Sequence, residues 1–238
     1  AYGEWKDYNA YSDFISSEGV PVFYARVDHV SVPLAQEGTG QVVVDFTPEP
    51  LTQDVSFVFH IEKTADVVVD SLTAEISGIP STMELTTGLI LAQKTYKLLF
   101  RPTYAALPSA ADSASAEALR CEASVNIPGI VRSHTEDMVT GPGILQIAIY
   151  THYDYEEEGT QRKAAKVFHA GINLYHTLKE RKSLQWDEEE NGYRQASRSI
   201  TVEIGSPLNI DKDGILNGGS TSTGLDQWIP GETFEIEV

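Results

Sequence analysis

The stretch 67–90 limits the possible folds most strongly, because apolar and polar side chains alternate along it and glycine and proline interrupt the pattern. Its three opening valines, Val67–Val69, are β-branched and favour a pleated strand. Gly78 relaxes the backbone and Pro80 cannot donate to a strand ladder, so we expect the strand to end near Gly78 and a second turn to form at Gly88. The apolar face of the strand comprises Leu72, Ala74 and Ile76, and the pattern resumes with Met83 and Leu85.

The same period of two recurs along the whole chain of 238 residues, with turn signals about every ten residues. This rhythm is typical of an antiparallel β-sandwich. Helical patterns of ten residues do not separate the segments, which argues against βαβ units. The sequence therefore predicts an all-β protein, whose further predicted strands are 20–32, 41–47, 55–62, 96–100, 119–127, 144–153, 167–177, 200–204 and 234–238.

Residues 105–117 differ from this rhythm because small side chains dominate and large apolar ones are nearly missing. Such a segment buries too little area to offset its ordering entropy. We interpret it as a linker between an N-terminal β-sandwich domain, 18–104, and a C-terminal one, 118–238. A short helix over Ser115–Leu119 is the alternative.

The segment Ser77-Gly-Ile-Pro80, followed by Leu85-Thr-Thr-Gly88, resembles the Bacteroidetes fimbrillin superfamily, in particular the fimbrillin-associated anchor lipoproteins of the minor fimbrium anchoring subunit type. The resemblance implies two transthyretin-like antiparallel β-sandwich domains in tandem. It also implies a role in fimbria (pilus) anchoring, assembly or cell adhesion, at the cell surface. The precursor would carry a lipidated cysteine ahead of Ala1, and this lipid would hold the protein on the cell outer membrane.

Strand addition is the mechanism that this family implies, with fimbrial subunits or other surface proteins as partners. An exposed sheet edge accepts a strand from a neighbouring subunit, and main-chain hydrogen bonds supply the affinity. The alternating C-terminal segment is our candidate for this pairing, or for filling the protein's own groove. Its apolar residues are Phe234, Ile236 and Val238.

The charge and the cysteine count exclude several classes of protein. A formal net charge of −18 disfavours nucleic acid and anionic lipid surfaces, since both attract clustered Lys and Arg. Cys121 is the single cysteine, so an intramolecular disulfide and a Cys-based metal site are excluded, and we expect it to be a small buried hydrophobe. Apolar runs stay well short of a transmembrane span.

The sequence contains no convincing catalytic motif, and we expect a non-enzymatic protein without a cofactor. The six histidines form no HExxH pair, and the runs of glutamate are typical of solvated loops. One segment, Asn209-Ile-Asp211-Lys-Asp213-Gly214, matches the opening of a Ca²⁺-binding EF-hand loop, but Ser220 stands where the bidentate Glu belongs. Ca²⁺ at Asn209, Asp211 and Asp213 is therefore the minor hypothesis, and an Asp-Gly turn is the main one.

A carbohydrate-binding β-sandwich module of a surface lipoprotein is the alternative function. Exposed aromatic rings would then stack on the faces of glycans. Trp5, Trp186 and Trp228 lie in loop-like contexts that suit this role, although ordinary packing at the rim explains them equally. Two of them exposed and coplanar in one groove would favour sugar binding.

Overall fold

The computed structural model describes residues 14–15, 23–25, 27, 29–30, 43–107, 116–216 and 226–236. These residues form strands and one short helix, which confirms the all-β prediction. In chain order the elements are β1 (Phe14–Ile15), β2 (Phe23–Tyr24), β3 (Glu49–Pro50), β4 (Gln53–Thr64), β5 (Val68–Glu84), β6 (Leu89–Phe100), β7 (Thr103–Ala106), β8 (Ala116–Ile127), β9 (Ile144–Glu157), β10 (Thr160–Asn173), α1 (Tyr175–Arg181), β11 (Leu184–Asp187), β12 (Gly192–Gln195), β13 (Ser199–Glu203), β14 (Leu208–Ile210), β15 (Ile215–Leu216) and β16 (Trp228–Ile236).

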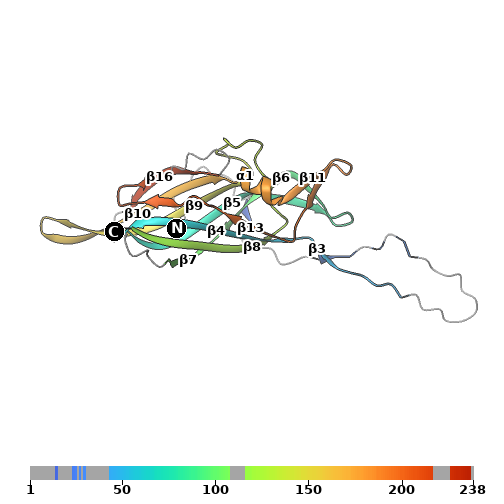
Figure 1. Ribbon diagram of the computed structural model, residues 1–238, viewed down its shortest axis with the longest axis horizontal. Coiled ribbons are helices and arrows are strands. Elements are labelled where there is room, and N and C mark those ends of the chain that lie inside the picture. The colour runs from blue at the N-terminus through green and yellow to red at the C-terminus, as the bar shows by residue number, and fades with distance from the viewer. Residues whose placement is uncertain are drawn as a thin grey trace, which may run out of the picture.

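Two curled sheets pack face to face as a sandwich (Figure 1). The large sheet has the order β11-β12-β6-β5-β9-β10-β16, and β1 pairs with β6. The small sheet has the order β15-β14-β4-β8-β7, and β13 also pairs with β4. Most pairs are antiparallel as predicted, but β1 runs parallel to β6, and β13 and β14 run parallel to β4.

The prediction of two tandem domains, 18–104 and 118–238, is not confirmed. β4 pairs with β8 from Gln53↔Ile127 to Thr64↔Ala116, and β5 pairs with β9 from Val68↔His152 to Ile76↔Leu145. Each of these pairs joins a strand from one predicted domain to a strand from the other. The two ranges therefore share both sheets within the described part of the chain.

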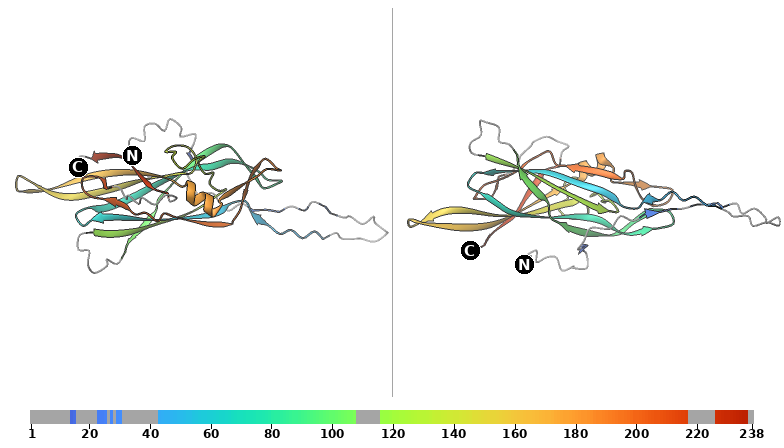
Figure 2. Two further views of the ribbon diagram at one scale, coloured as in Figure 1. Left: turned by 45° about the horizontal axis from the view of Figure 1, so that its top comes forward. Right: turned by 90° about the horizontal axis from the view of Figure 1, so that it is seen from below.

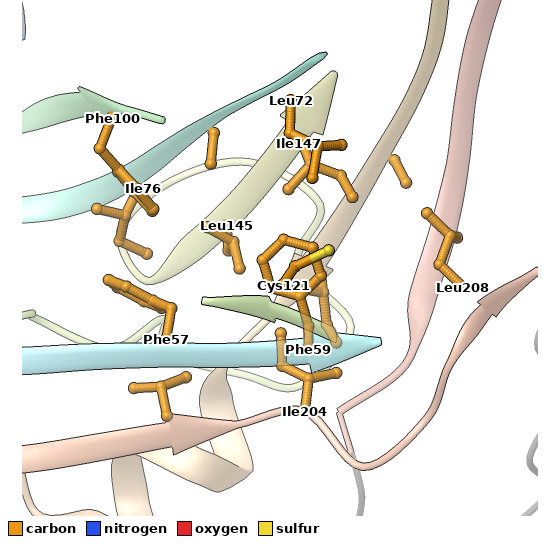
Figure 3. Close-up of a cluster of buried hydrophobic side chains, with 14 of the residues drawn as sticks. Phe57, Phe59, Leu72, Ile76, Phe100, Cys121, Leu145, Ile147, Ile204 and Leu208 are labelled. Carbon is orange, nitrogen blue, oxygen red and sulfur yellow. The ribbon is translucent and has the colours of Figure 1, made fainter. Parts of the chain in front are cut away.

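One hydrophobic core lies between the sheets and draws on both halves of the chain. Val55, Phe57, Phe59 and Ile61 of β4 are fully buried, as their alternation predicts. Figure 3 shows Phe57 and Phe59 directed towards the side chains of the facing sheet. The facing residues include Leu72 and Ile76 of β5, Leu145 and Ile147 of β9, and Phe168 of β10.

The predicted turn at Gly78 and Pro80 is wrong, because β5 continues through both residues to Glu84. The pairing of β5 with β6 shifts register at Ser77/Ile79 and again at Pro80/Thr82, so these residues form bulges within one strand. Pro80 lies beyond Ile76, the last β5 residue that pairs with β9, where β5 has its strand neighbour only on the β6 side. The second predicted turn, at Gly88, is confirmed, since it joins β5 to β6.

Several other predicted boundaries need correction. Of the predicted strand 20–32, only β2 is a strand among the described residues, and residues 43–47 of the predicted strand 41–47 are not in a strand. The alternative helix over Ser115–Leu119 is wrong, because β8 begins at Ala116. The predicted strand 167–177 ends at Asn173 and the helix α1 follows it.

Two extensions project from opposite ends of the sandwich (Figure 2). At one end the β9–β10 hairpin continues past its neighbouring strands. At the other end an arm, which we define as the described residues between 23 and 50, leaves the body at the β2–β3 pair.

Candidate interaction surfaces

The predicted pairing strand is present and forms the edge of the large sheet. β16 pairs antiparallel with β10, with Phe234 opposite Val167 and Ile236 opposite Ala165. The Phe234 ring packs edge-on against His169, with ring centroids 5.4 Å apart. Val238 lies outside the described residues. The segment therefore occupies a place in its own sheet, which is the groove-filling alternative that the sequence left open.

The two ends of β16 are held differently. At its start, Trp228 is buried, its Nε1 donates to the Ser206 carbonyl at 2.9 Å, and its ring packs edge-on against Phe59. At its other end, residues 231–235 are exposed or half-buried. The last described residues of β16 are attached through the ladder to β10 and through contacts with His169 and Lys166, whereas Trp228 belongs to the core.

Lys166 of β10, like His169, makes a side-chain contact with the exposed end of β16. Its Nζ lies 3.2 Å from Glu235 Oε1 and donates to the Lys212 carbonyl at 2.7 Å. Burial lowers the pKa of Lys166, but the hydrogen bond to Glu235 and the charges of Tyr153 and Glu235 outweigh it, so the pKa lies above its ordinary value. Lys166 therefore stays charged and joins β16 to the β14–β15 turn.

The outer side of β16 has no strand neighbour among the described residues. Its sequence nevertheless contains features that hinder unwanted pairing with another strand. Pro230 lacks an N–H, and a register shift sets Gly231 and Glu232 opposite the single residue His169. Charges, proline and bulges are the usual devices that keep an edge strand from pairing at random. These features disfavour indiscriminate pairing at the outer side of β16.

The arm at the opposite end exposes large apolar side chains. Phe23, Val43 and Phe46 are 59%, 71% and 60% exposed. The arm is held at its root, where the Tyr24 hydroxyl donates to Glu49 at 3.4 Å and lies against Gly88. The sequence predicted core strands here because apolar and polar residues alternate. Such alternation does not reveal whether a second sheet covers the apolar face.

The predicted Ca²⁺ segment forms a hairpin turn between β14 and β15. The Asp211 carboxylate accepts hydrogen bonds from the backbone N–H groups of Asp213 and Gly214, at 2.7 and 2.8 Å. Asn209 pairs with Leu216 across the hairpin. The geometry is that of an Asx turn, in which Asp211 is engaged by the backbone. Across the described ranges no group of three or more His, Cys, Asp or Glu side chains is arranged to hold a metal ion.

The aromatic residues considered for sugar binding are separated. Trp228 is in the core and Trp5 lies outside the described residues. Trp186 is 47% exposed on β11, and its ring meets Tyr193 edge-on at 4.9 Å and 76°. Within the described chain, the two exposed coplanar tryptophans that would favour a sugar site are not found.

The titratable residues pair in ways that stabilise the fold. His152 Nδ1 lies 2.8 Å from Asp70, and His176 Nε2 lies 2.6 Å from Glu136. Burial raises the pKa of Cys121 to about 12, which keeps the thiol protonated and unreactive at neutral pH. The two histidine pairs involve different residues, and Cys121 is buried in the core.

Comparison with known proteins gives no match: no family model, curated protein or solved structure is similar to this chain. Within the described residues no helix has the length and apolarity needed to cross a membrane. The function of the β16 edge, the arm and the β9–β10 hairpin must therefore be inferred from their geometry.

Proposed function

We propose that the protein is a non-enzymatic, fimbrillin-like cell-surface subunit that contributes to the anchoring, assembly or adhesion of a fimbria. The observation that carries the proposal is the placement of β16, a C-terminal edge strand that pairs only with β10 among the described residues. Because residues 231–235 lie at the exposed edge rather than in the core, they can leave β10 and pair with the equivalent edge of a neighbouring subunit.

The exposed arm supports an assembly role. Phe23, Val43 and Phe46 are each exposed along one projecting arm, and an assembling subunit buries such residues against a neighbour. Under this proposal the protein acts outside the cell in a member of the Bacteroidetes. Its precursor is a lipoprotein anchored in the outer membrane, and its partners are fimbrial subunits or other surface proteins.

A reversible lock on β16 tests the proposal. Val167 and Phe234 are directly opposite each other, so the double variant Val167→Cys/Phe234→Cys places two thiols within disulfide reach. We expect the oxidised variant to recover no fimbrial subunits in a pull-down of full-length lipidated protein from cells, and the reduced variant to recover them. Equal recovery by the oxidised and reduced forms would show that β16 does not exchange.

Deletion of residues 234–238 is the complementary test. It should also abolish the recovery of fimbrial subunits in the pull-down, while the sandwich still unfolds cooperatively on heating. Oxidised wild-type protein is the control, because its buried Cys121 has no second cysteine to pair with.

The alternative function, glycan binding, depends on Trp186 and Tyr193. If wild-type protein is retained on a glycan array, recovers no protein partner, and loses glycan retention on Trp186→Ala, the sugar-binding module replaces the fimbrial proposal.

A further inference from the structure

We propose that the tip of the β9–β10 hairpin of one copy docks on the basic C-terminal end of α1 in a second copy, so that copies associate head to tail. The hairpin tip is defined as residues 153–164, and the basic end of α1 as Arg181 with Lys182. The contact uses neither β16 nor the arm. It extends the proposed function, since it names a second copy as one partner in assembly.

The hairpin tip has strand neighbours on neither side among the described residues. The pairing of β5 with β9 begins at Val68↔His152, and the pairing of β16 with β10 ends at Ala165↔Ile236. Beyond these points β9 and β10 still pair as far as Glu157↔Thr160. Both views in Figure 2 show this ribbon extending past the body. An isolated two-stranded ribbon is marginally stable in water, so a ribbon of this length is expected to be covered in an assembly.

The charged side chains of the tip leave an acidic surface. Glu157 pairs with Arg162 at 2.8 Å. Asp154, Glu156 and Glu158 are exposed, and the described residues give them no side-chain partner. After the Glu157–Arg162 pair is set aside, Lys163 is the one positive side chain in the tip beside these three carboxylates. On the other face of the ribbon the Tyr153 and Tyr155 rings lie 6.3 Å apart, and Tyr155 adds a half-exposed aromatic contact surface.

The end of α1 supplies the complementary charge. Arg181 and Lys182 are exposed, and neither forms an ion pair with a described residue. The helix ends here, and positive side chains are electrostatically favourable at a helix C-terminus. Lys179 is already occupied over the Tyr175 ring, at 5.6 Å from its centroid. They are two of the 17 basic residues in a chain that has 35 acidic ones.

The arrangement of these charges selects one mode of association. The hairpin points away from its own α1, so the contact cannot form within one molecule (Figures 1 and 2). A symmetric tip-to-tip dimer would bring Asp154 and Glu156 against their own copies, and like charges at such a contact are repulsive. A contact between the acidic tip and the basic end of α1 joins two different surfaces, and contacts of this kind extend into rows of molecules rather than closing into a dimer.

A charge swap tests the contact at one fixed ionic strength of about 0.15 M, where the screening length is about 8 Å and repulsion between distant charges is weak. We compare self-association by sedimentation velocity for the wild type, Glu156→Lys/Glu158→Lys and Arg181→Glu/Lys182→Glu. Each double variant should weaken association at least about tenfold, which equals ~1.4 kcal/mol. An equimolar mixture of the two variants should restore association, because reversed charges then face each other.

The matched control is Glu188→Lys/Glu189→Lys in the exposed β11–β12 turn. It changes the net charge by the same amount as the hairpin variant and should leave association unchanged or strengthen it by reducing general repulsion. Three outcomes overturn the proposal: a wild type that stays monomeric at all concentrations, equal weakening by the control, or no restoration in the mixture. None of these variants alters β16. If they overturn the hairpin contact while the oxidised Val167→Cys/Phe234→Cys variant still fails to recover fimbrial subunits, the docking proposal is refuted and strand exchange is not.

Discussion

The carbonyl oxygen of Val131 lies 2.5 Å from the position that a β-carbon on Gly78 would occupy. The loop before β9 crosses β5 at this point, where the Val131 N–H donates to the Gly78 carbonyl at 2.9 Å. Gly78 also has a φ of +91°, a conformation that other residues avoid. One glycine thus allows both the bulge in β5 and the crossing of the loop, which is why β5 can continue where the sequence predicted a turn.

We therefore predict that Gly78→Ala strongly destabilises the protein. Gly159 gives the matched comparison, because its φ is +76° but nothing lies within 4 Å of the position that a β-carbon would take there. Gly159→Ala should cost only the left-handed conformation, about 1–2 kcal/mol. Gly78→Ala should cost at least ~2 kcal/mol more, measured by urea denaturation, because the added carbon also meets the loop backbone. Equal costs would show that the loop simply moves aside.

A second prediction concerns the buried amide of Gln53. Its Nε2 donates to the Ser197 carbonyl at 2.7 Å, and its Oε1 accepts from the Ser183 hydroxyl at 2.7 Å. Ser183 Oγ in turn accepts from the Ile130 N–H at 3.0 Å. Gln53→Leu leaves several of these groups buried without partners, and we expect a loss of about 2 kcal/mol or more in the free energy of unfolding.

The control for this change is Gln185→Leu on the exposed part of β11, which should alter the unfolding free energy by less than about 0.5 kcal/mol. If Gln53→Leu is equally mild, the chain segments around Ser183 and Ser197 must find other donors.

The strands were predictable because alternation is a local property, whereas their partners were not. Two rows of alternate residues are buried as predicted: Val55, Phe57, Phe59 and Ile61 in β4, and Leu145, Ile147 and Ile149 in β9. The same alternation is compatible with one sandwich or two, because it carries no information about which strand lies beside which. The small-residue segment around residue 110 thus suggested a domain boundary, although β4 and β8 on its two sides share a sheet.

The helix α1 shows a second limit of local patterns. It has only seven residues and buries one of them, Leu178, so it gives no detectable helical period. The Asn173 side chain accepts from the N–H of Tyr175 at 3.0 Å, but the next two N–H groups are capped from far along the chain: the Asp226 carboxylate accepts from the N–H groups of His176 and Thr177, each at 3.0 Å. A cap fifty residues away cannot be recognised in the sequence beside the helix, and the basic end of α1 was missed with it.

A third prediction separates the two described tryptophans. Trp228→Ala removes a buried ring and its hydrogen bond to Ser206, and should cost about 3–5 kcal/mol. Trp186→Ala removes an exposed ring with one edge-on neighbour, and should cost about 1 kcal/mol. Urea denaturation followed by circular dichroism measures both variants without relying on tryptophan fluorescence. A large cost for Trp186→Ala would mean that this residue supports the fold rather than being available for a ligand.

The last prediction concerns the pH dependence that Cys121 contributes. Burial raises the pKa of its thiol to about 12 in the folded protein, whereas an unfolded cysteine ionises near pH 8.5. The folded state therefore favours the neutral thiol. The resulting contribution to stability is fully present below pH 8.5 and is lost as the pH rises towards 12, because only the unfolded state releases its proton in that interval.

Comparison with Cys121→Ala isolates this contribution, since lysines and tyrosines titrate alike in both proteins. We expect the stability advantage of the wild type over Cys121→Ala to shrink by about 1.4 kcal/mol per pH unit above pH 9. Iodoacetamide should label native Cys121 only as fast as the protein unfolds, since the side chain is fully buried. Rapid labelling of the native protein, or a constant difference between the two proteins up to about pH 10.5, would place Cys121 in contact with solvent.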